Sequence, residues 1–153
     1  MKTTTHDRGE IVRALTVLLQ PGQVTELRAL DASRPPDRWF STWSGYFDDP
    51  ERLADAVLPL VARGFYFVPN EVNPDLLARA ANRARDVKKD PTTSDADIIR
   101  RRWLLVDCDP IRAAGISSTD AEHEEAVNRA AEIQGWLQSQ GWPAPALADS
   151  GNG

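Results

Sequence analysis

Apolar side chains recur at helical spacing in four stretches of the chain, and each stretch begins or ends at a recognisable signal. Residues 8–20 carry apolar positions three and four residues apart and stop at Pro21-Gly22. The other three stretches begin at a residue whose side chain can cap a helix: Asp49, Asn73 and Thr119. A proline follows the first two caps, and a glutamate three residues after Thr119 completes a capping box. The pattern predicts four helices, and Pro59 is expected to shorten or kink the second.

Shorter runs of apolar and β-branched residues predict strands between these helices. The predicted strands are residues 23–30, 41–47, 65–69 and 102–108, and residues 145–149 are a candidate start of another. In the first strand, Thr25, Leu27 and Ala29 share the face that we expect to be buried. Gly45 is a candidate β-bulge in the second. The polar stretch 86–97 is expected to be a mobile surface loop.

Residues 102–108, Arg-Trp-Leu-Leu-Val-Asp-Cys, are the most strand-like run in the chain. Four apolar residues precede an acid, which predicts a central strand buried on both faces. Helices and strands alternate along the sequence without an internal repeat. This order favours an α+β fold in which helices cover a mixed sheet.

Composition and size are those of a globular protein. The chain has 153 residues, of which 41% are hydrophobic and 27% are charged, so general disorder is excluded. One cysteine and two histidines exclude an internal disulfide, a zinc knuckle and a histidine-rich metal site. The sequence shows neither a membrane-spanning apolar run nor a secretory signal, so we expect a cytoplasmic protein without a membrane partner. The five tryptophans are expected to be packing residues rather than base-stacking platforms.

Charge is unevenly distributed. The net charge of −5 excludes a global basic field for nucleic acid. Residues 79–102 nevertheless contain eight basic and four acidic residues, a local net charge of +4. Three consecutive arginines, Arg100, Arg101 and Arg102, lead directly into the predicted central strand. They are candidates to hold phosphates, and the alternative is a solvated edge.

Two carboxylates stand at the end of that strand. Side chains alternate along a strand, so Asp107 and Asp109 should point to the same side. Carboxylates held that close repel each other, and a divalent cation between them would remove the repulsion. Hard oxygen ligands favour Mg²⁺ or Mn²⁺, and pairs of these ions stabilise both oxygens in nucleotidyl transfer. The alternative is an acidic loop in which Asp109 caps a turn before Pro110.

Three weaker features complete the candidate chemistry. The small residues near the end of the sequence can form an anion nest or a plain surface turn, and they are Ser150, Gly151, Asn152 and Gly153. They lack the lysine and the glycine spacing of a P-loop. His123 is expected to be exposed on its helix. Cys108 should lie opposite the two acids as a small core residue.

The run Arg101–Arg112, followed by Gly115–His123, resembles the bifunctional primase-polymerases of phages, plasmids and other mobile elements, within the archaeo-eukaryotic primase superfamily. Weaker similarity extends over most of the chain from about residue 24. It lies in Glu26–Arg28, Ser44–Phe47, Asn70–Pro74, Ala80–Asn82, Gly141–Pro143 and Ser150–Gly153.

The resemblance implies a modified RNA-recognition-type sheet whose first motif, Asp-x-Asp, binds the catalytic divalent metals, and Asp107 and Asp109 match that motif. It implies DNA primase and polymerase activity in replication of a mobile element. The partners would be a DNA template, nucleoside triphosphates and a helicase on the same or a separate chain. Arg112 and Arg100–Arg102 would steer the triphosphate or the template. His123 does not stand at the position of the family's second-motif histidine.

The resemblance also implies a division of the chain. Residues 1–22 would be an N-terminal helix and residues 23–153 a partial catalytic domain, ending before the second-motif histidine and the third-motif acid. We therefore expect an incomplete active site. The central strand would keep one unpaired edge, which would lower stability and promote association.

Two other functions remain open. Phosphatases of the haloacid dehalogenase type also carry an apolar strand that ends in Asp-x-Asp, with the first acid as nucleophile, here Asp107. Their usual Thr or Val four residues later is Ile111 in this chain. The third possibility is a non-catalytic nucleic-acid-binding fragment.

Overall fold

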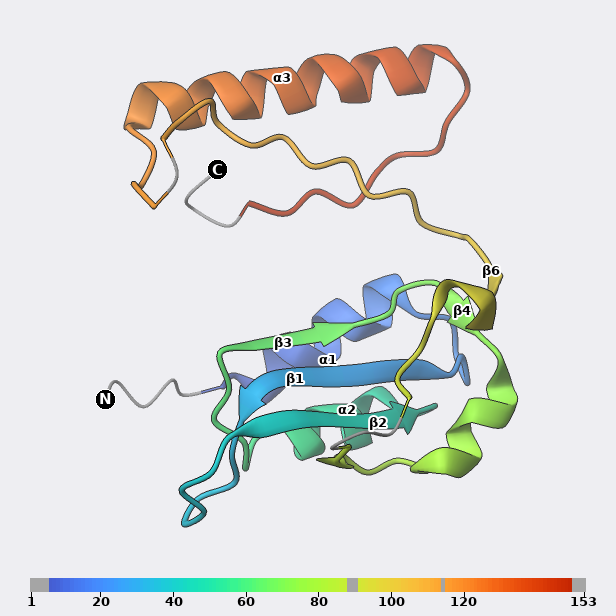
Figure 1. The fold of residues 1–153 in the computed structure, drawn as a ribbon. Helices are drawn as coiled ribbons and strands as arrows, with labels where there is room; N and C mark the ends of the chain where they lie inside the picture. Colours follow the sequence, from blue (N-terminus) through green and yellow to red (C-terminus); the bar gives the residue numbers. More distant parts are fainter. Residues whose placement is uncertain (1–5, 88–90, 114, 150–153) are drawn as a thin grey trace. The chain divides into compact units, whose positions relative to one another are not determined.

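The computed structural model describes residues 6–87, 91–113 and 115–149, and it divides the chain into two compact units, Met1–Leu104 and Leu105–Gly153 (Figure 1). The helical segments of the first unit are α1 (Arg8–Leu18), α2 (Pro50–Val57) and the short 3-10 helices η1 (Pro74–Arg79) and η2 (Asp95–Asp97). Its strands are β1 (Thr25–Ala32), β2 (Ser41–Phe47), β3 (Gly64–Phe67), β4 (Glu71–Val72), β5 (Arg85–Asp86) and β6 (Ile98–Arg100). The second unit contains α3 (Asp120–Ser139).

The main sheet has four strands in the order β3-β1-β2-β5, and β4 pairs with β6 in a separate two-stranded sheet. All of these strand pairs are antiparallel, so the α+β class is confirmed but the main sheet is not mixed. Among the paired strands only β1 and β2 are consecutive in the chain, and the short connection between them suits an antiparallel pair. The bulge lies in β1 between Ala29 and Ala32, whereas Gly45 sits in regular register opposite Leu27.

The main core lies between the sheet and α1 and α2, which cover the same face of the sheet (Figure 1). Leu27 and Phe47 of the sheet pack against Leu15, Leu53 and Val57 of the helices and against Leu19, which follows α1. The predicted buried face of β1 is confirmed, because Thr25, Leu27 and Ala29 are all at most 2% exposed. Alternation in β1 therefore places one full row of side chains under the helices.

The predicted helix starts in the first unit are confirmed by their caps. Asp49 accepts hydrogen bonds from two backbone N–H groups at the start of α2, and Asn73 accepts one at the start of η1. Helix α2 ends at Val57, two residues before Pro59, as expected from the missing N–H of proline. The helix after Asn73 is only a short 3-10 segment, because the chain beyond it bonds to β2. There the Tyr46 N–H donates to Ala80 O, and the Tyr46 carbonyl accepts from Asn82 N–H.

The predicted central strand at residues 102–108 is absent. Three of its apolar side chains face solvent, with Leu104 64%, Leu105 87% and Val106 46% exposed. A strand needs a partner for its backbone groups, and no described strand pairs with this segment. The N–H groups of Arg102 and Trp103 instead donate to the side-chain oxygen of Asn70, at 2.7 and 2.9 Å. Residues 145–149, the other candidate strand, are also irregular.

The second unit is built around α3. Thr119 and Glu122 form the predicted capping box, and the Thr119 N–H and hydroxyl hold the pKa of the Glu122 carboxyl below its ordinary value. The helix is followed by Gly141 with a φ of +83°, in the left-handed region that glycine tolerates. No helix in the described ranges is long and apolar enough to span a membrane.

Two predictions about individual side chains are wrong. Three of the five tryptophans, Trp39, Trp136 and Trp142, are 50–62% exposed and are not core residues, whereas Trp43 and Trp103 are partly buried. Which apolar residues are covered depends on tertiary packing. His123 is partly buried rather than exposed, because its Nε2 lies 3.2 Å from Asp149 Oδ2.

Candidate functional site

The sheet face opposite α1 and α2 carries a buried carboxylate. Glu26 is fully buried although it lies on the face of β1 that alternation assigns to the polar side. Cross-strand register places Tyr46 beside Glu26 and Ser44 beside Arg28. These four side chains therefore occupy adjacent positions on two central strands.

Hydrogen bonds satisfy the Glu26 carboxylate from several directions. Arg28 Nη2 donates to Glu26 Oε2 at 2.7 Å, and the Ser44 hydroxyl donates to Oε1. The backbone N–H of Thr93 donates to Oε2 at 3.0 Å. Burial raises the pKa of Glu26, but the hydrogen bonds from Arg28, Ser44 and Thr93 outweigh it and hold that pKa below its ordinary value. Glu26 is therefore a buried anion neutralised by Arg28.

The same network fixes a segment that lies far away in the sequence. Thr93 O accepts a hydrogen bond from Arg28 Nη2 at 3.2 Å, and Thr93 Oγ1 lies 3.3 Å from Tyr46 OH. Both contacts hold the end of the predicted 86–97 loop against the sheet. Residues 88–90 of that loop lie outside the described residues, and residues 95–97 form η2. The described residues of this stretch therefore include a short helix and contacts with the sheet, whereas the sequence predicted a mobile surface loop.

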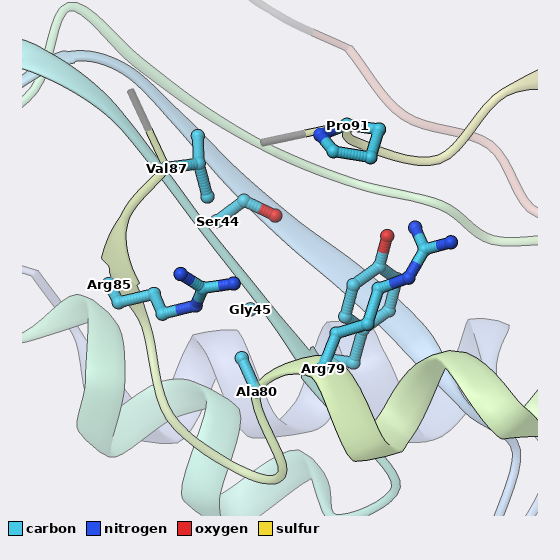
Figure 2. Close-up of a pocket in the computed structure, with 8 residues that line it drawn as sticks. Ser44, Gly45, Arg79, Ala80, Arg85, Val87 and Pro91 are labelled. Carbon is cyan, nitrogen blue, oxygen red and sulfur yellow. The ribbon is translucent and has the colours of Figure 1, made fainter. Parts of the chain in front are cut away.

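A cavity of about 260 Å³ opens beside this network. Its lining comes from β2, η1, β5 and the residues that follow them, and comprises Ser44, Gly45, Tyr46, Arg79, Ala80, Arg85, Val87 and Pro91. Figure 2 shows Arg79 and Arg85 reaching the cavity from two different elements, with Gly45 between them in this view. The cavity thus combines two guanidinium groups with small and apolar side chains.

Asp107 and Asp109, the predicted metal ligands, are exposed residues of an irregular segment in the second unit. The predicted strand that would place both side chains on one side is absent, so the structure does not support the predicted alignment of these two acids. Among the described residues, no cluster of three or more His, Cys, Asp or Glu side chains is arranged to hold a metal. The metal site at these two acids stays a prediction from the sequence.

The predicted phosphate-contacting residues belong to both units. Arg100 ends β6, Arg101 is exposed, and Arg102 pairs with Glu71 at 3.6 Å. Arg112, in the second unit, donates to the Ile116 carbonyl oxygen. Ser150–Gly153 lie outside the described residues. Cys108 is half-buried, although the strand that was expected to turn it into the core is absent.

Sequence reasoning missed the buried network and the arginine-lined cavity. The available signal was the Glu26 and Arg28 pair, whose opposite charges stand two residues apart on one face of a predicted strand. Arg79 and Arg85 were recognised only as members of a basic window, because their convergence depends on the pairing of β5 with β2. Comparison of the chain with protein-family models, curated proteins and solved structures finds no match.

Proposed function

We propose that this chain is a portion of a DNA primase-polymerase that performs metal-dependent, template-directed nucleotidyl transfer. The observation that carries the proposal is the run Arg101–His123, in which Asp107-Cys-Asp109 stands between arginines and a capped helix. An antiparallel sheet with helices on one face is compatible with the sheet type that the resemblance implies. The two arginines at the cavity offer cationic groups of the kind that bind phosphates.

In this reaction a 3′-hydroxyl attacks the α-phosphate of an incoming nucleoside triphosphate, and pyrophosphate leaves. Asp107 and Asp109 would hold Mg²⁺ or Mn²⁺, and the carboxylate oxygens of both residues fit the hard-ligand preference of these ions. Bound there, the metal supplies charge neutralisation at the transferring phosphate. Octahedral ions keep several waters, so two exposed carboxylates are a chemically reasonable partial ligand set. The protein's own contribution is to position the substrates and stabilise charge.

The metal proposal predicts that Mn²⁺ binds at Asp107 and Asp109. In a titration of the ¹⁵N-labelled chain, the paramagnetic ion should first broaden the amide signals next to these two residues. The variant Asp107→Asn/Asp109→Asn should lose that selective broadening. The matched control, Glu124→Gln/Glu125→Gln, removes two neighbouring acids from α3 of the same unit and should keep it. Equal broadening in the Asn variant would place the ion elsewhere.

The resemblance implies that the family's reaction uses a histidine and a third acid in addition to Asp107 and Asp109. The family's histidine and third acid have no counterparts at matching positions in this sequence. Primer extension should therefore be negligible for residues 1–153 and measurable for a longer chain that supplies both groups. In that longer chain, Asp107→Ala should reduce incorporation by more than the roughly 10–100-fold loss typical of outer-shell metal partners. Template-directed synthesis by the 153-residue chain, lost on Asp107→Ala, would contradict the need for the additional motifs.

The phosphatase alternative makes a different chemical prediction. An aspartyl-phosphate or a beryllofluoride adduct would form at Asp107, because the first acid of that motif is a nucleophile. A primase-polymerase forms no covalent intermediate at this carboxylate. Mass spectrometry after incubation with a phosphoryl donor therefore separates the two functions, and an adduct at Asp107 would replace the polymerase proposal.

A further inference from the structure

We propose that the cavity beside β2 and β5 is a binding site for a single phosphate group carried by a nucleotide or by a nucleic-acid strand. It lies wholly within the first unit and involves neither Asp107 nor Asp109. The inference therefore does not depend on the metal proposal. It rests on the charge of the described lining residues, the size of the cavity and the contacts that hold those residues.

The described part of the lining is positively charged. Arg79 and Arg85 belong to it, and none of the lining residues that the structure describes is a carboxylate. The nearby Glu26 is fully buried and is compensated by Arg28. Asp86 follows Arg85 in the chain but pairs opposite Trp43, on the other face of the sheet from Arg85 and Ser44. Asp97 interacts electrostatically with Arg79 and therefore offsets part of the positive potential.

The size and chemistry of the cavity suit a small anion. Its volume of about 260 Å³ is slightly below that of most ligand pockets, which favours a small group such as a phosphate. Guanidinium groups bind phosphate oxygens through paired N–H donors, which ammonium groups cannot reproduce. The floor contributes small residues, Gly45 and Ala80, which leave that space open.

Backbone pairing and hydrogen bonds hold several of the residues that line the cavity. Arg85 lies in register opposite Ser44, and Ala80 O accepts a hydrogen bond from Tyr46 N–H, which holds the end of η1 beside β2. Pro91 also lines the cavity, two residues before Thr93, which is bonded to Glu26. A site with pre-positioned walls loses less conformational entropy on binding. The buried ion pair thus acts as a support for the cavity.

The ligand can come from two sources that share this chemistry, a free nucleotide and the backbone of a single strand. The ¹⁵N-labelled chain would be titrated at constant ionic strength with inorganic phosphate, with deoxyadenosine monophosphate and with a short oligothymidylate. Each productive probe should shift the amide signals of Ser44 and Gly45 and the Nε–Hε signals of Arg79 and Arg85. Tighter binding of the mononucleotide identifies a nucleotide site, and tighter binding of the oligonucleotide identifies a strand site.

The variant Arg79→Gln/Arg85→Gln should weaken binding of the productive probe by about tenfold or more, because hydrogen bonds to charged groups are among the stronger ones. The matched control, Arg13→Gln/Arg63→Gln, removes the same charge from exposed sites outside the cavity and should bind like the parent chain. If the double cavity variant fails to fold, Arg85→Lys keeps the charge and should still weaken binding through loss of the paired donors. Equal losses in cavity and control variants, or no shift at Arg79 and Arg85 with any probe, would overturn the proposal.

Discussion

Replacing Glu26 with alanine should lower the free energy of unfolding of the first unit by about 3 kcal/mol, near the lower end of the range for breaking a buried ion pair. Glu26 is fully buried and Arg28 keeps 33% of its side chain exposed, so water can partly solvate the guanidinium that remains. The change also removes the acceptor for the Ser44 hydroxyl and the Thr93 N–H. Urea unfolding followed by the dispersed amide signals of the first unit would measure the loss.

Two variants calibrate that result. Glu26→Gln keeps the shape of the side chain but not its charge, so its stability should fall between those of the parent chain and Glu26→Ala. Ser44→Ala removes one donor and should cost only about 1 kcal/mol. If Glu26→Ala unfolds at the same urea concentration as the parent chain, the network contributes nothing to stability.

The Glu26 network also predicts how stability depends on pH. The pKa of Glu26 in the folded chain lies below its ordinary value of 4.5, so the unfolded chain binds the proton more readily. The stabilisation is therefore fully present above that ordinary value and is lost as pH falls through the folded pKa. In Glu26→Gln this part of the acid dependence should disappear, while the contribution of the other carboxylates remains.

Replacing Gly45 with alanine should destabilise the first unit by at least the ~1–3 kcal/mol typical of an overpacked core. A Cβ atom there would lie well inside the contact distance of the Arg83 carbonyl oxygen, 2.7 Å from its carbon and 3.1 Å from the Cα of Ala84. These are backbone atoms, so the whole segment between η1 and β5 would have to move. Because Gly45 also lines the cavity, the variant should lose phosphate binding together with stability.

The same substitution at Gly135 is the matched control. Gly135 lies inside α3, and an added Cβ would meet no atom within 4 Å. Alanine is favoured over glycine in a helix by up to ~1 kcal/mol, so Gly135→Ala should raise the stability of α3. Circular dichroism in urea would compare the two variants. A Gly45→Ala chain as stable as its parent would show that the approach of Arg83 to β2 is not as close as described.

The helix starts and the first strands could be predicted from residues that are neighbours in the sequence. Asp49, Asn73 and Thr119 cap the segments that follow them because a cap needs only a side-chain oxygen and N–H groups two or three residues away. The alternating face of Thr25, Leu27 and Ala29 is equally local. Residues 102–108 have the same apolar character, yet they form no strand, because a strand exists only where another backbone satisfies its N–H and C=O groups.

The burial of Glu26 and the arginine-lined cavity depend on partners that are distant in the sequence. Thr93 bonds to Glu26 across 67 positions, and Arg85 reaches the cavity because β5 pairs with β2. A carboxylate in a strand can face water or a guanidinium. The residues next to it in the sequence do not distinguish these outcomes, because the cost of removing the carboxylate from water depends on which distant residues cover it. Composition and spacing therefore indicated where helices begin and which face of β1 is apolar. Long-range pairing decided which charges are buried and which line the cavity. The free energies of burial and pairing arise only from contacts between segments that folding brings together.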